Sequence, residues 1–499
     1  MPGDGYDLAI IGGGINGAGI AADAAARGLK VVLLERDDLG GGTSSASSKL
    51  IHGGLRYLEH GAFRLVRESL GEREVLLARA PHLVQPLRFV IPHAPGMRHR
   101  ALMRLGLLLY DRLSTRRSLP NSRAIDLSQD AAGTPLRDGF KAGFTYYDCT
   151  VDDARLVVTV ALDAAERGAR IMTRTQAVAA ERGDDAWRIT AETAAGTITL
   201  TARALVNAAG PWCAEIAHRI NPASGAPAVR LVRGTHIVVP RIRGAHDAYL
   251  LQNDDRRVVF ALPFEGDFTL IGTTEIPVSS PDDGFIASDA ETDYLLDAAR
   301  RFFSHPMAVE DVIWRFAGVR ALVDDGARTA SALSRDYRID LAWDGSGPAL
   351  LTIVGGKITT FRSLADAALA RLAPCYPGMG RAWTADAPLP GGDFGEGGAV
   401  AFGEALSRRR RGFAQATLTR LAALYGTRAE RLLGDAQSDG DLGASIGGGL
   451  TAREVLYLRD NEWARTAEDV LWRRTKAGLH IGEGGQERAA EQIAALLAS

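Results

Sequence analysis

A glycine-rich turn near the N-terminus has the residue types that a dinucleotide pyrophosphate requires. Residues 12–17 read Gly-Gly-Gly-Ile-Asn-Gly and follow the apolar run Tyr6–Ile11. In such a turn, glycines permit a tight bend and a close approach of the backbone to the pyrophosphate, while the helix N-terminus faces the anion. Glu35 ends the next apolar run, Val31–Leu34, where a carboxylate accepts hydrogen bonds from ribose hydroxyls and repels the 2′-phosphate of NADP. Together these features predict a dinucleotide site rather than a plain glycine turn.

A hydroxyl-rich segment, Thr43–Lys49, follows this acid and bears on which dinucleotide binds. Its hydroxyl groups suit pyrophosphate and ribityl oxygens, although a solvated serine loop has the same composition. A dehydrogenase that reduces a flavin with NADH usually carries a second glycine motif for the nicotinamide cofactor, and this sequence has none. We therefore expect FAD as the cofactor, and no metal.

Several longer motifs extend along nearly the whole chain. Residues 43–59 read TSSASSKLIHGGLRYLE. The other segments are Tyr147–Cys149, Asn207–Trp212, Gly272–Thr274, Gly355–Thr360 and Leu471–Lys476. This set resembles the motifs of FAD-dependent sn-glycerol-3-phosphate dehydrogenases of the aerobic, respiratory type. Two residues depart from that pattern, since Ala321 stands where proline is usual and Glu275 where aspartate is common.

The resemblance implies oxidation of sn-glycerol 3-phosphate to dihydroxyacetone phosphate, by hydride transfer from C2 to flavin N5, with the electrons passed to membrane quinone. Arginine forks suit bidentate phosphate binding, and lysine supplies a point charge. A single arginine is more often a surface residue, so this interpretation depends on four cations in matching motifs. The resemblance places around the substrate Arg56, Arg320, Arg335 and Lys357, with Tyr57 and Thr273 as hydrogen-bonding neighbours.

A general base is expected because removal of the C2 hydroxyl proton makes the substrate a better hydride donor. His52 lies one helical turn before Arg56, so the two would share a face if that stretch is helical. His236 lies in an expected strand of the substrate domain, and imidazole titrates near neutrality. The two histidines are equal candidates, and each has the alternative of a structural role. Arg56, Arg320 and Lys357 complete the expected catalytic set.

Cofactor contacts are expected at the motifs described above. The positive end of the helix after Gly355–Gly356 would face the pyrimidine edge of the flavin, where negative charge develops on reduction. The full expected set is Gly12, Gly14, Ile15, Asn16, Gly17, Glu35, Arg36, Thr43, Ser44, Ser45, Ser47, Ser48, Lys49, His52, Gly53, Val178, Ala209, Gly210, Gly355, Gly356, Lys357 and Thr359.

The apolar pattern indicates the elements that must position these residues. Tyr6–Ile11 and Val31–Leu34 are expected as parallel strands around the alanine-rich helix Asn16–Arg27. The expected fold class is α/β plus α+β: a Rossmann-like FAD-binding domain, an inserted antiparallel-sheet substrate domain and a C-terminal all-helical domain without strands. The expected segments are 1–80, 146–215 and 336–388 for the FAD-binding domain, 81–145 for a substrate- or membrane-facing part, 216–335 for the substrate-binding (cap) domain and 389–499 for the helical domain.

Composition excludes several classes of protein. The 499 residues include 58 Lys plus Arg and 60 Asp plus Glu, so no basic field argues for nucleic acid. Cys149, Cys213 and Cys375 lie far apart, which fits a reducing compartment and neither a disulfide framework nor a zinc site. We find no signal segment before the first strand and no apolar run long enough to span a bilayer. A cytoplasmic protein, peripheral on the inner face of the cell membrane, is therefore expected.

A basic amphipathic helix is expected within Arg98–Arg117, where Leu102, Leu105, Leu109 and Leu113 recur at helical spacing among arginines. Such a helix either lies in a membrane interface with its cations at anionic head groups or packs its apolar stripe on the core. Because the resembled family delivers electrons to membrane quinone, we weigh the two alternatives equally. The oligomeric state stays open, with a homodimer as one alternative.

Three rival functions remain. A glycerol-3-phosphate oxidase would use O2 in place of quinone. A related flavin oxidase of an amino or hydroxy acid would present a carboxylate to one arginine, and the four cations argue against it. A flavin-binding redox sensor or partner-docking protein, with the helical C-terminus as its interaction module, would have no need of an intact substrate-binding set.

Overall fold

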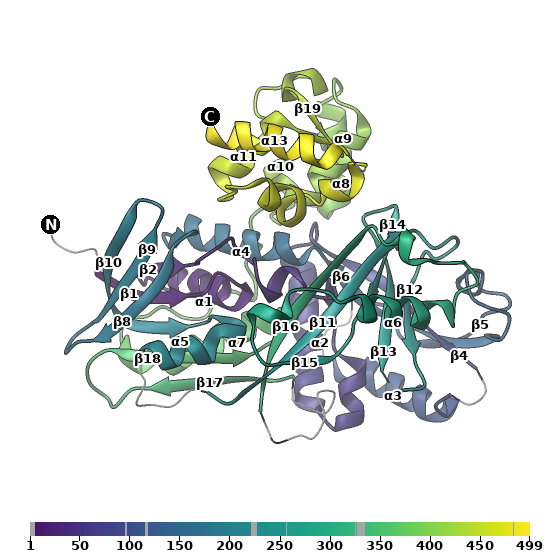
Figure 1. Cartoon of the computed structure of the whole chain (residues 1–499), viewed down its shortest axis with the longest axis horizontal. Helices are drawn as coiled ribbons and strands as arrows, with labels where there is room; N and C mark the ends of the chain where they lie inside the picture. Colours follow the sequence, from purple (N-terminus) through teal and green to yellow (C-terminus); the bar gives the residue numbers. More distant parts are fainter. Residues whose placement is uncertain are drawn as a thin grey trace.

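The computed structural model describes residues 5–94, 97–114, 118–220, 227–255, 257–324, 326, 335–482 and 484–499. Two large sheets lie side by side, and a C-terminal lobe stands above helix α4 (Asp153–Glu166), as Figure 1 shows. Each sheet is built from segments that are far apart in the sequence. The glycine turn and the cation-bearing segments therefore reach the same region only after the chain has folded.

The first sheet is mostly parallel and carries the glycine turn. Its spatial order is β17 (Tyr337–Ala342), β18 (Ala349–Gly355), β10 (Gly196–Asn207), β1 (Gly5–Ile11), β2 (Val31–Leu34) and β7 (Arg170–Met172). Strands β8 (Gln176–Arg182) and β9 (Trp187–Thr193) extend it as an antiparallel meander from β10. Because β1, β2, β7, β10 and β18 run parallel, their carboxyl ends meet at one edge. Ligands bind at this edge in open α/β sheets.

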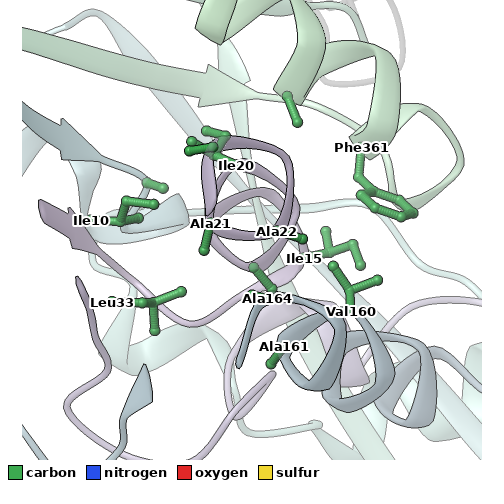
Figure 2. Close-up of a cluster of buried hydrophobic side chains, with 14 of the residues drawn as sticks. Ile10, Ile15, Ile20, Ala21, Ala22, Leu33, Val160, Ala161, Ala164 and Phe361 are labelled. Atoms are coloured by element: carbon green, nitrogen blue, oxygen red, sulfur yellow. The ribbon is translucent and has the colours of Figure 1, made fainter. Parts of the chain in front are cut away.

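Helix α1 (Ile15–Ala26) packs on the first sheet between α4 and α7 (Phe361–Leu372). Figure 2 shows Ile10 and Leu33 of the sheet on one side of α1, and Ala161 and Ala164 of α4 on another. Small side chains let the helices approach closely, and Gly19 is the limiting case. A Cβ there would lie 2.8 Å from the Phe361 ring. The alanine-rich composition of α1 therefore sets how tightly the glycine turn is held.

The second sheet is mixed but mainly antiparallel, with one parallel pair between β4 and β12. Its spatial order is β15 (Ile276–Val278), β11 (Val229–Pro240), β14 (Phe268–Gly272), β13 (Val258–Phe264), β12 (Ala248–Gln252), β4 (Val84–His93), β6 (Ala142–Val151) and β3 (Leu50–Ile51). Strand β16 (Trp314–Val323) pairs with β11, and β5 (Arg123–Asp126) pairs with β6.

Helices cover both faces of the second sheet. Helix α6 (Asp289–Arg300) packs on one face with Phe302 and Phe303. Helices α2 (Phe63–Arg79) and α3 (Arg100–Leu113) pack on the other. Helix α5 (Cys213–Ile220) lies on the first sheet, on the face opposite α1.

The C-terminal lobe is helical, as expected, with its own apolar core. The expectation of no strand there needs correction, because a short hairpin of β19 (Ser445–Gly447) and β20 (Leu450–Thr451) interrupts the helices. A π-helical turn, Asp469–Arg474, packs against helix α4. The helices are α8 (Gly398–Arg409), α9 (Gln415–Tyr425), α10 (Ala429–Leu433), α11 (Ala452–Asn461), α12 (Ala477–His480) and α13 (Gly485–Ala498).

In the parts of the chain that the structure describes, every helix is too short or too polar to cross a bilayer. Helix α3 confirms the expected basic helix over Arg100–Leu113, and the expected Arg116 and Arg117 lie outside the described residues.

Candidate active site

A cavity of about 600 Å³ lies at the carboxyl edge of the first sheet and reaches the second sheet. The glycine turn after β1 forms one wall. Gly12 has a φ of +112°, and a Cβ there would lie 2.5 Å from the carbonyl oxygen of Ala208. A Cβ on Gly17 would lie 1.9 Å from the Gly12 oxygen. Only glycine permits this turn, and it aims the N-terminus of α1 at the cavity.

Polar groups at this wall fit the diphosphate of a dinucleotide. Ser44 Oγ accepts the backbone N–H of Ile15 at 3.1 Å. Asn16 Nδ2 donates to the carbonyl of Gly355 at 3.1 Å, whereas Asn16 Oδ1 is buried without a hydrogen-bond partner among the described residues. Gly14 is the N-cap of α1 and has no side chain to bond to the helix end. A helix N-terminus that faces a cavity, with an unsatisfied amide oxygen beside it, indicates a ligand with both acceptor and donor groups.

Glu35 lies at the end of β2, as expected. Its Oε2 accepts the Gly13 N–H at 2.6 Å and its Oε1 accepts the Asp37 N–H at 2.8 Å. Burial raises the pKa of this carboxyl, and the two backbone N–H groups oppose the rise. Each carboxylate oxygen retains a second lone pair, so both bonds are compatible with a ribose hydroxyl donating to the same group.

An aromatic stack that we did not expect from the sequence closes this end of the cavity. The Arg36 guanidinium lies 4.1 Å from the centroid of Trp212, and Trp212 stacks on Phe285 at 5.4 Å. All three residues line the cavity. Trp212 belongs to a motif noted above, but Phe285 comes from the other sheet's connections and nothing near it in sequence indicates this contact. A planar stack beside a ribose-binding acid suits an adenine ring.

The hydroxyl loop divides into residues that face the cavity and residues that hold the loop. Thr43, Ser44, Ser47 and Ser48 line the cavity, and Ser45 and Lys49 do not. Lys49 Nζ lies 2.8 Å from Asp153 Oδ1 instead, and burial lowers the pKa of the lysine. Ser47 bonds to the same carboxylate through its N–H and hydroxyl.

Most of the remaining expected cofactor residues line the cavity, and a few do not. Gly17, Gly53 and Val178 lie behind the wall rather than on it. Gly53 donates its N–H to the hydroxyl of Tyr110 at 2.9 Å, within a buried cluster around Asp148. Beside Val178, the cavity is lined instead by Thr175, Gln176 and Ala177. The expected residues that line it are Gly12, Gly14, Ile15, Asn16, Glu35, Arg36, Thr43, Ser44, Ser47, Ser48, His52, Ala209, Gly210, Gly355, Gly356, Lys357 and Thr359.

Three arginines from separate segments converge on one carboxylate in the cavity wall. Arg335 Nη2, Arg320 Nη1 and Arg56 Nη1 lie 2.7, 3.7 and 3.9 Å from Glu275 Oε1. Burial and the neighbouring Arg335 lower the pKa of Arg320 to about 10, so its guanidinium stays charged at neutral pH. Among the described residues these three guanidiniums share the Glu275 carboxylate, and such a cluster of cations suits a dianionic phosphate.

Two of the expected hydrogen-bonding neighbours lie beside these cations. Arg320 Nη2 donates to Thr273 Oγ1 at 3.2 Å. Both side chains occupy space left by Gly234, where a Cβ would lie 2.4 Å from Arg320 Nη2. Lys357 Nζ lies 4.8 Å from the centroid of the Tyr57 ring and donates to Ser69 Oγ at 2.9 Å. Burial lowers the pKa of Lys357. Tyr57, Thr273 and all four cations line the same cavity.

Both candidate histidines line the cavity, in different surroundings. His52 follows β3 and precedes the 3-10 helix Leu55–His60, so the stretch from His52 through Arg56 is not one helix and the condition for a shared helix face is not met. Its backbone N–H donates to Thr359 Oγ1 at 3.3 Å. Burial, with Lys357 nearby, lowers the pKa of His52 to about 3.

His236 lies on β11 and stacks on Phe316. Its Nε2 lies 2.9 Å from Ser48 Oγ, and its Nδ1 is buried with no partner in the described chain. Burial lowers the pKa of His236 well below its usual range. Both imidazoles are therefore neutral at neutral pH, the form in which a ring nitrogen accepts a proton.

Comparisons with known proteins also indicate a flavin-binding protein. The family model for FAD dependent oxidoreductases matches residues 7–362, and the model for the C-terminal domain of alpha-glycerophosphate oxidase matches residues 382–499. The chain is 50% identical to D-erythritol 1-phosphate dehydrogenase of Brucella abortus, covering 97% of this chain and 96% of that protein. It is 48% identical to glycerol-3-phosphate dehydrogenase of Pseudomonas aeruginosa, covering 98% and 95%.

A solved structure matches the whole architecture. Glycerol-3-phosphate dehydrogenase from Bacillus halodurans, complexed with FAD, superposes with a TM-score of 0.78 at 27% identity, covering 99% of this chain and 91% of that one. These matches confirm the expected family resemblance, fold class and cofactor. The chain belongs to the FAD-dependent oxidoreductase family, and the cavity at the glycine turn is where its residues would hold FAD.

Proposed function

We propose that the protein is an FAD-dependent dehydrogenase of a small polyol phosphate, with sn-glycerol 3-phosphate as substrate and dihydroxyacetone phosphate as product. The main observation behind this proposal is that Arg56, Arg320 and Arg335 converge on Glu275 inside the FAD cavity. An amino acid or hydroxy acid would need one guanidinium fork for its carboxylate. The relatives from Pseudomonas aeruginosa and Bacillus halodurans, both named glycerol-3-phosphate dehydrogenases, support the same substrate.

Different residues in the cavity have different roles in this proposal. Arg320, Arg335 and Arg56 bind the phosphate, and Glu275 keeps their forks together when no substrate is present. Lys357 and Tyr57 lie on the same wall and orient the substrate hydroxyls. FAD, when bound, supplies the acceptor for the hydride that leaves C2.

We propose His52 as the general base. The hydrogen bond that His52 makes within the described chain involves its backbone N–H and not its ring, whereas Nε2 of His236 is engaged by Ser48 and its Nδ1 is buried. A neutral ring nitrogen of His52 can therefore accept the C2 hydroxyl proton. The imidazolium that results lies near Lys357, and the negative phosphate of the substrate offsets that repulsion. His236 then has a positioning role through Ser48.

D-erythritol 1-phosphate is the second candidate substrate, because the relative from Brucella abortus that carries its name is 50% identical to this chain. Both compounds offer a phosphate ester and free hydroxyls on a short carbon chain. The cation cluster recognises the part that they share, so it does not discriminate between them. Only a direct comparison of the two compounds assigns the substrate.

Anaerobic addition of sn-glycerol 3-phosphate to the FAD-loaded protein is expected to bleach the flavin absorbance. Glycerol at the same concentration should leave it unchanged, because it lacks the phosphate that the arginines bind. D-erythritol 1-phosphate is titrated in parallel, and the compound with the larger ratio of reduction rate to dissociation constant is the substrate. If neither phosphate ester reduces the flavin, the proposed function is wrong.

We further propose that the protein docks on a membrane surface through α3 and passes its electrons to quinone there. Leu102 and Leu105 have exposed fractions of 64% and 63%, and Leu109 of 37%. The opposite side of the helix, with Leu107 and Tyr110, is buried on the second sheet. An apolar row that faces outward beside arginines is typical of an interfacial helix, since core packing would bury the leucines.

Replacing Leu105 and Leu109 together by Glu is expected to release the protein from anionic lipid vesicles while reduction of a soluble dye persists. The carboxylates would enter the acyl boundary and meet anionic head groups. Val400→Glu is the matched control, because Val400 is 76% exposed on α8 of the C-terminal lobe. Vesicle co-sedimentation measures the difference. Equal sedimentation of the double variant and the control would remove α3 from the docking surface.

The electron acceptor is tested separately by the rate at which the substrate-reduced protein consumes O2. Rapid consumption would favour an oxidase over a quinone-linked dehydrogenase.

A further inference from the structure

The loop Asp38–Lys49 shapes the FAD cavity but has little structure of its own. It connects β2 to β3 and contains one short 3-10 turn, Thr43–Ser45. Residues 40–44 and 46–48 of the loop line the cavity. Its three consecutive glycines, residues 40–42, give the unfolded loop much conformational freedom. The conformation that admits FAD must therefore be imposed by contacts outside the loop.

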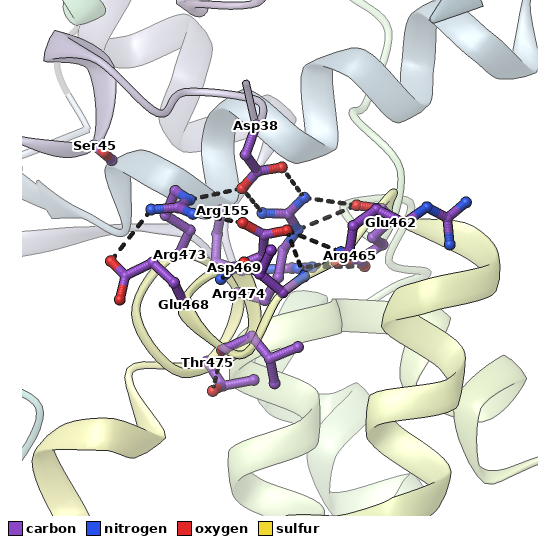
Figure 3. Close-up of polar contacts among 12 residues, drawn as sticks. Asp38, Ser45, Arg155, Glu462, Arg465, Glu468, Asp469, Arg473, Arg474 and Thr475 are labelled. Carbon is purple, nitrogen blue, oxygen red and sulfur yellow. Dashed lines mark hydrogen bonds and ion pairs between the residues drawn. The ribbon is translucent and has the colours of Figure 1, made fainter. Parts of the chain in front are cut away.

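The C-terminal lobe holds the beginning of this loop. The Asp38 carboxylate is 1% exposed and accepts Arg474 Nη1 and Nη2 at 2.7 and 2.8 Å. Arg473 Nε donates to the same carboxylate at 2.6 Å. Arg474 is fully buried and also donates to the Glu462 carbonyl at 2.7 Å. Figure 3 shows both arginines reaching Asp38 from the π-helical turn.

The same segment also contacts the start of α4, which holds the end of the loop. Asp153 Oδ2 accepts the hydroxyl of Ser47 at 2.7 Å, and Asp153 Oδ1 accepts Lys49 Nζ at 2.8 Å. The neighbouring Asp152 accepts Lys476 Nζ at 2.9 Å. Residues 473–476 therefore act directly on one end of the loop and, through the start of α4, on the other.

Further ion pairs make this segment rigid. Asp469 Oδ1 accepts Arg174 Nη2 at 2.8 Å, and Asp469 Oδ2 accepts the backbone N–H groups of Arg465 and Thr466 at 2.8 and 3.0 Å. Arg155 of α4 pairs with the buried Glu462, as Figure 3 also shows. A buried network of ion pairs favours one arrangement, because removing a single partner leaves a buried charge unpaired.

We propose that the C-terminal lobe is a positioning element for the cofactor: Arg473, Arg474 and Lys476 hold the Asp38–Lys49 loop in the conformation that retains FAD. This role concerns the retention of FAD through contacts within the chain, so it is the same whichever polyol phosphate is the substrate. Arg474 touches neither the cavity nor the substrate cations. It acts on FAD through Asp38 and the loop.

Arg474→Ala in the full-length holoenzyme tests this inference. The variant leaves Asp38 buried with one arginine, and the loop can relax by moving toward water. FAD dissociation, followed as free-flavin fluorescence after dilution, is expected to accelerate roughly 10- to 100-fold. The visible circular dichroism of the bound flavin should change as well. Arg474→Lys, which keeps a charge at Asp38, should recover part of the retention.

The matched control is Arg420→Ala, which removes an ion pair to the fully buried Glu454 within the C-terminal lobe. It weakens the lobe without touching the loop, so FAD dissociation is expected to stay within roughly threefold of the original even if the melting temperature falls equally. Equal acceleration in both variants would overturn the proposal, because the effect would then be general destabilisation. Unchanged dissociation in Arg474→Ala would overturn it too.

Arg473→Gln serves if Arg474→Ala does not fold. Arg473 is partly exposed and shares Asp38 with Arg474, so its loss is milder. Asp38→Asn should accelerate FAD release, and the double variant should show less than the sum of the two effects, since both changes remove the ion pair between Arg473 and Asp38. Additive effects, or no effect from either change, would contradict a shared action through Asp38.

Discussion

His52→Ala is expected to slow anaerobic flavin reduction at saturating substrate by roughly 10²- to 10⁴-fold, the usual contribution of a general base. If His52 is the base, as proposed, the alanine side chain leaves the C2 hydroxyl without a proton acceptor, while the arginine cluster should still bind the phosphate. The dissociation constant for substrate should therefore change little. Stopped-flow measurement of the reduction rate against substrate concentration separates the two quantities. The rate should recover in part at high pH, where the alkoxide forms without help.

His236→Ala is the companion variant. Because Nε2 of His236 is engaged by Ser48, its removal should disturb the hydroxyl loop and slow reduction without recovery at high pH. If the reduction rate recovers at high pH in His236→Ala but not in His52→Ala, then His236 is the base and His52 has the positioning role. If both variants reduce the flavin at the original rate across the pH range, neither histidine is the base. Both proteins must first show a normal flavin absorbance spectrum, since His52 and His236 line the cofactor cavity.

The parts of the site that depend on neighbouring residues could be predicted from the sequence. The strand Val31–Leu34 is confirmed to the residue. Strand β1 begins one residue before its expected start, and α1 begins and ends one residue earlier than expected. A glycine turn, its helix and the acid after the next strand lie within a short stretch. Their chemistry and their geometry are therefore readable together.

Prediction from spacing failed where glycine breaks the helical period. His52 and Arg56 would share a helix face, but Gly53 and Gly54 lie between them, and Gly54 has a φ of +81°. This left-handed conformation starts the 3-10 helix only at Leu55. The two side chains reach the same cavity through the fold of the loop rather than through helical spacing.

Contacts between distant segments could not be predicted. Lys49 is one of the expected cofactor-binding residues, yet it pairs with Asp153, 104 positions along the chain. Glu275 was visible only as a departure from a family pattern, and its three arginines come from three different segments. Helix α3 shows a further limit: the same leucine period describes a core-facing and an outward-facing stripe, and only exposure in the folded protein distinguishes them.

Arg320→Ala is expected to raise KM for sn-glycerol 3-phosphate strongly, with a loss in kcat/KM of about 2–4 kcal/mol and a smaller change in kcat. In the proposed function the guanidinium contacts the phosphate before and during the reaction, so its loss should weaken the ground state and the transition state alike. Arg335 remains 2.7 Å from Glu275 in the variant, and the carboxylate then neutralises a larger share of the cluster. The positive charge that remains for a dianion is correspondingly smaller.

Arg315→Ala is the matched control for this variant, because Arg315 lies on the same strand, β16, and forms a surface ion pair with Asp289. Its effect on kcat/KM should be within roughly twofold, as for other exposed pairs. Arg320→Lys should recover only part of the loss, since an ammonium keeps the charge but not the fork. A fall in kcat with unchanged KM would contradict ground-state phosphate binding by Arg320. Its guanidinium would then act on charge that develops at the C2 oxygen during oxidation.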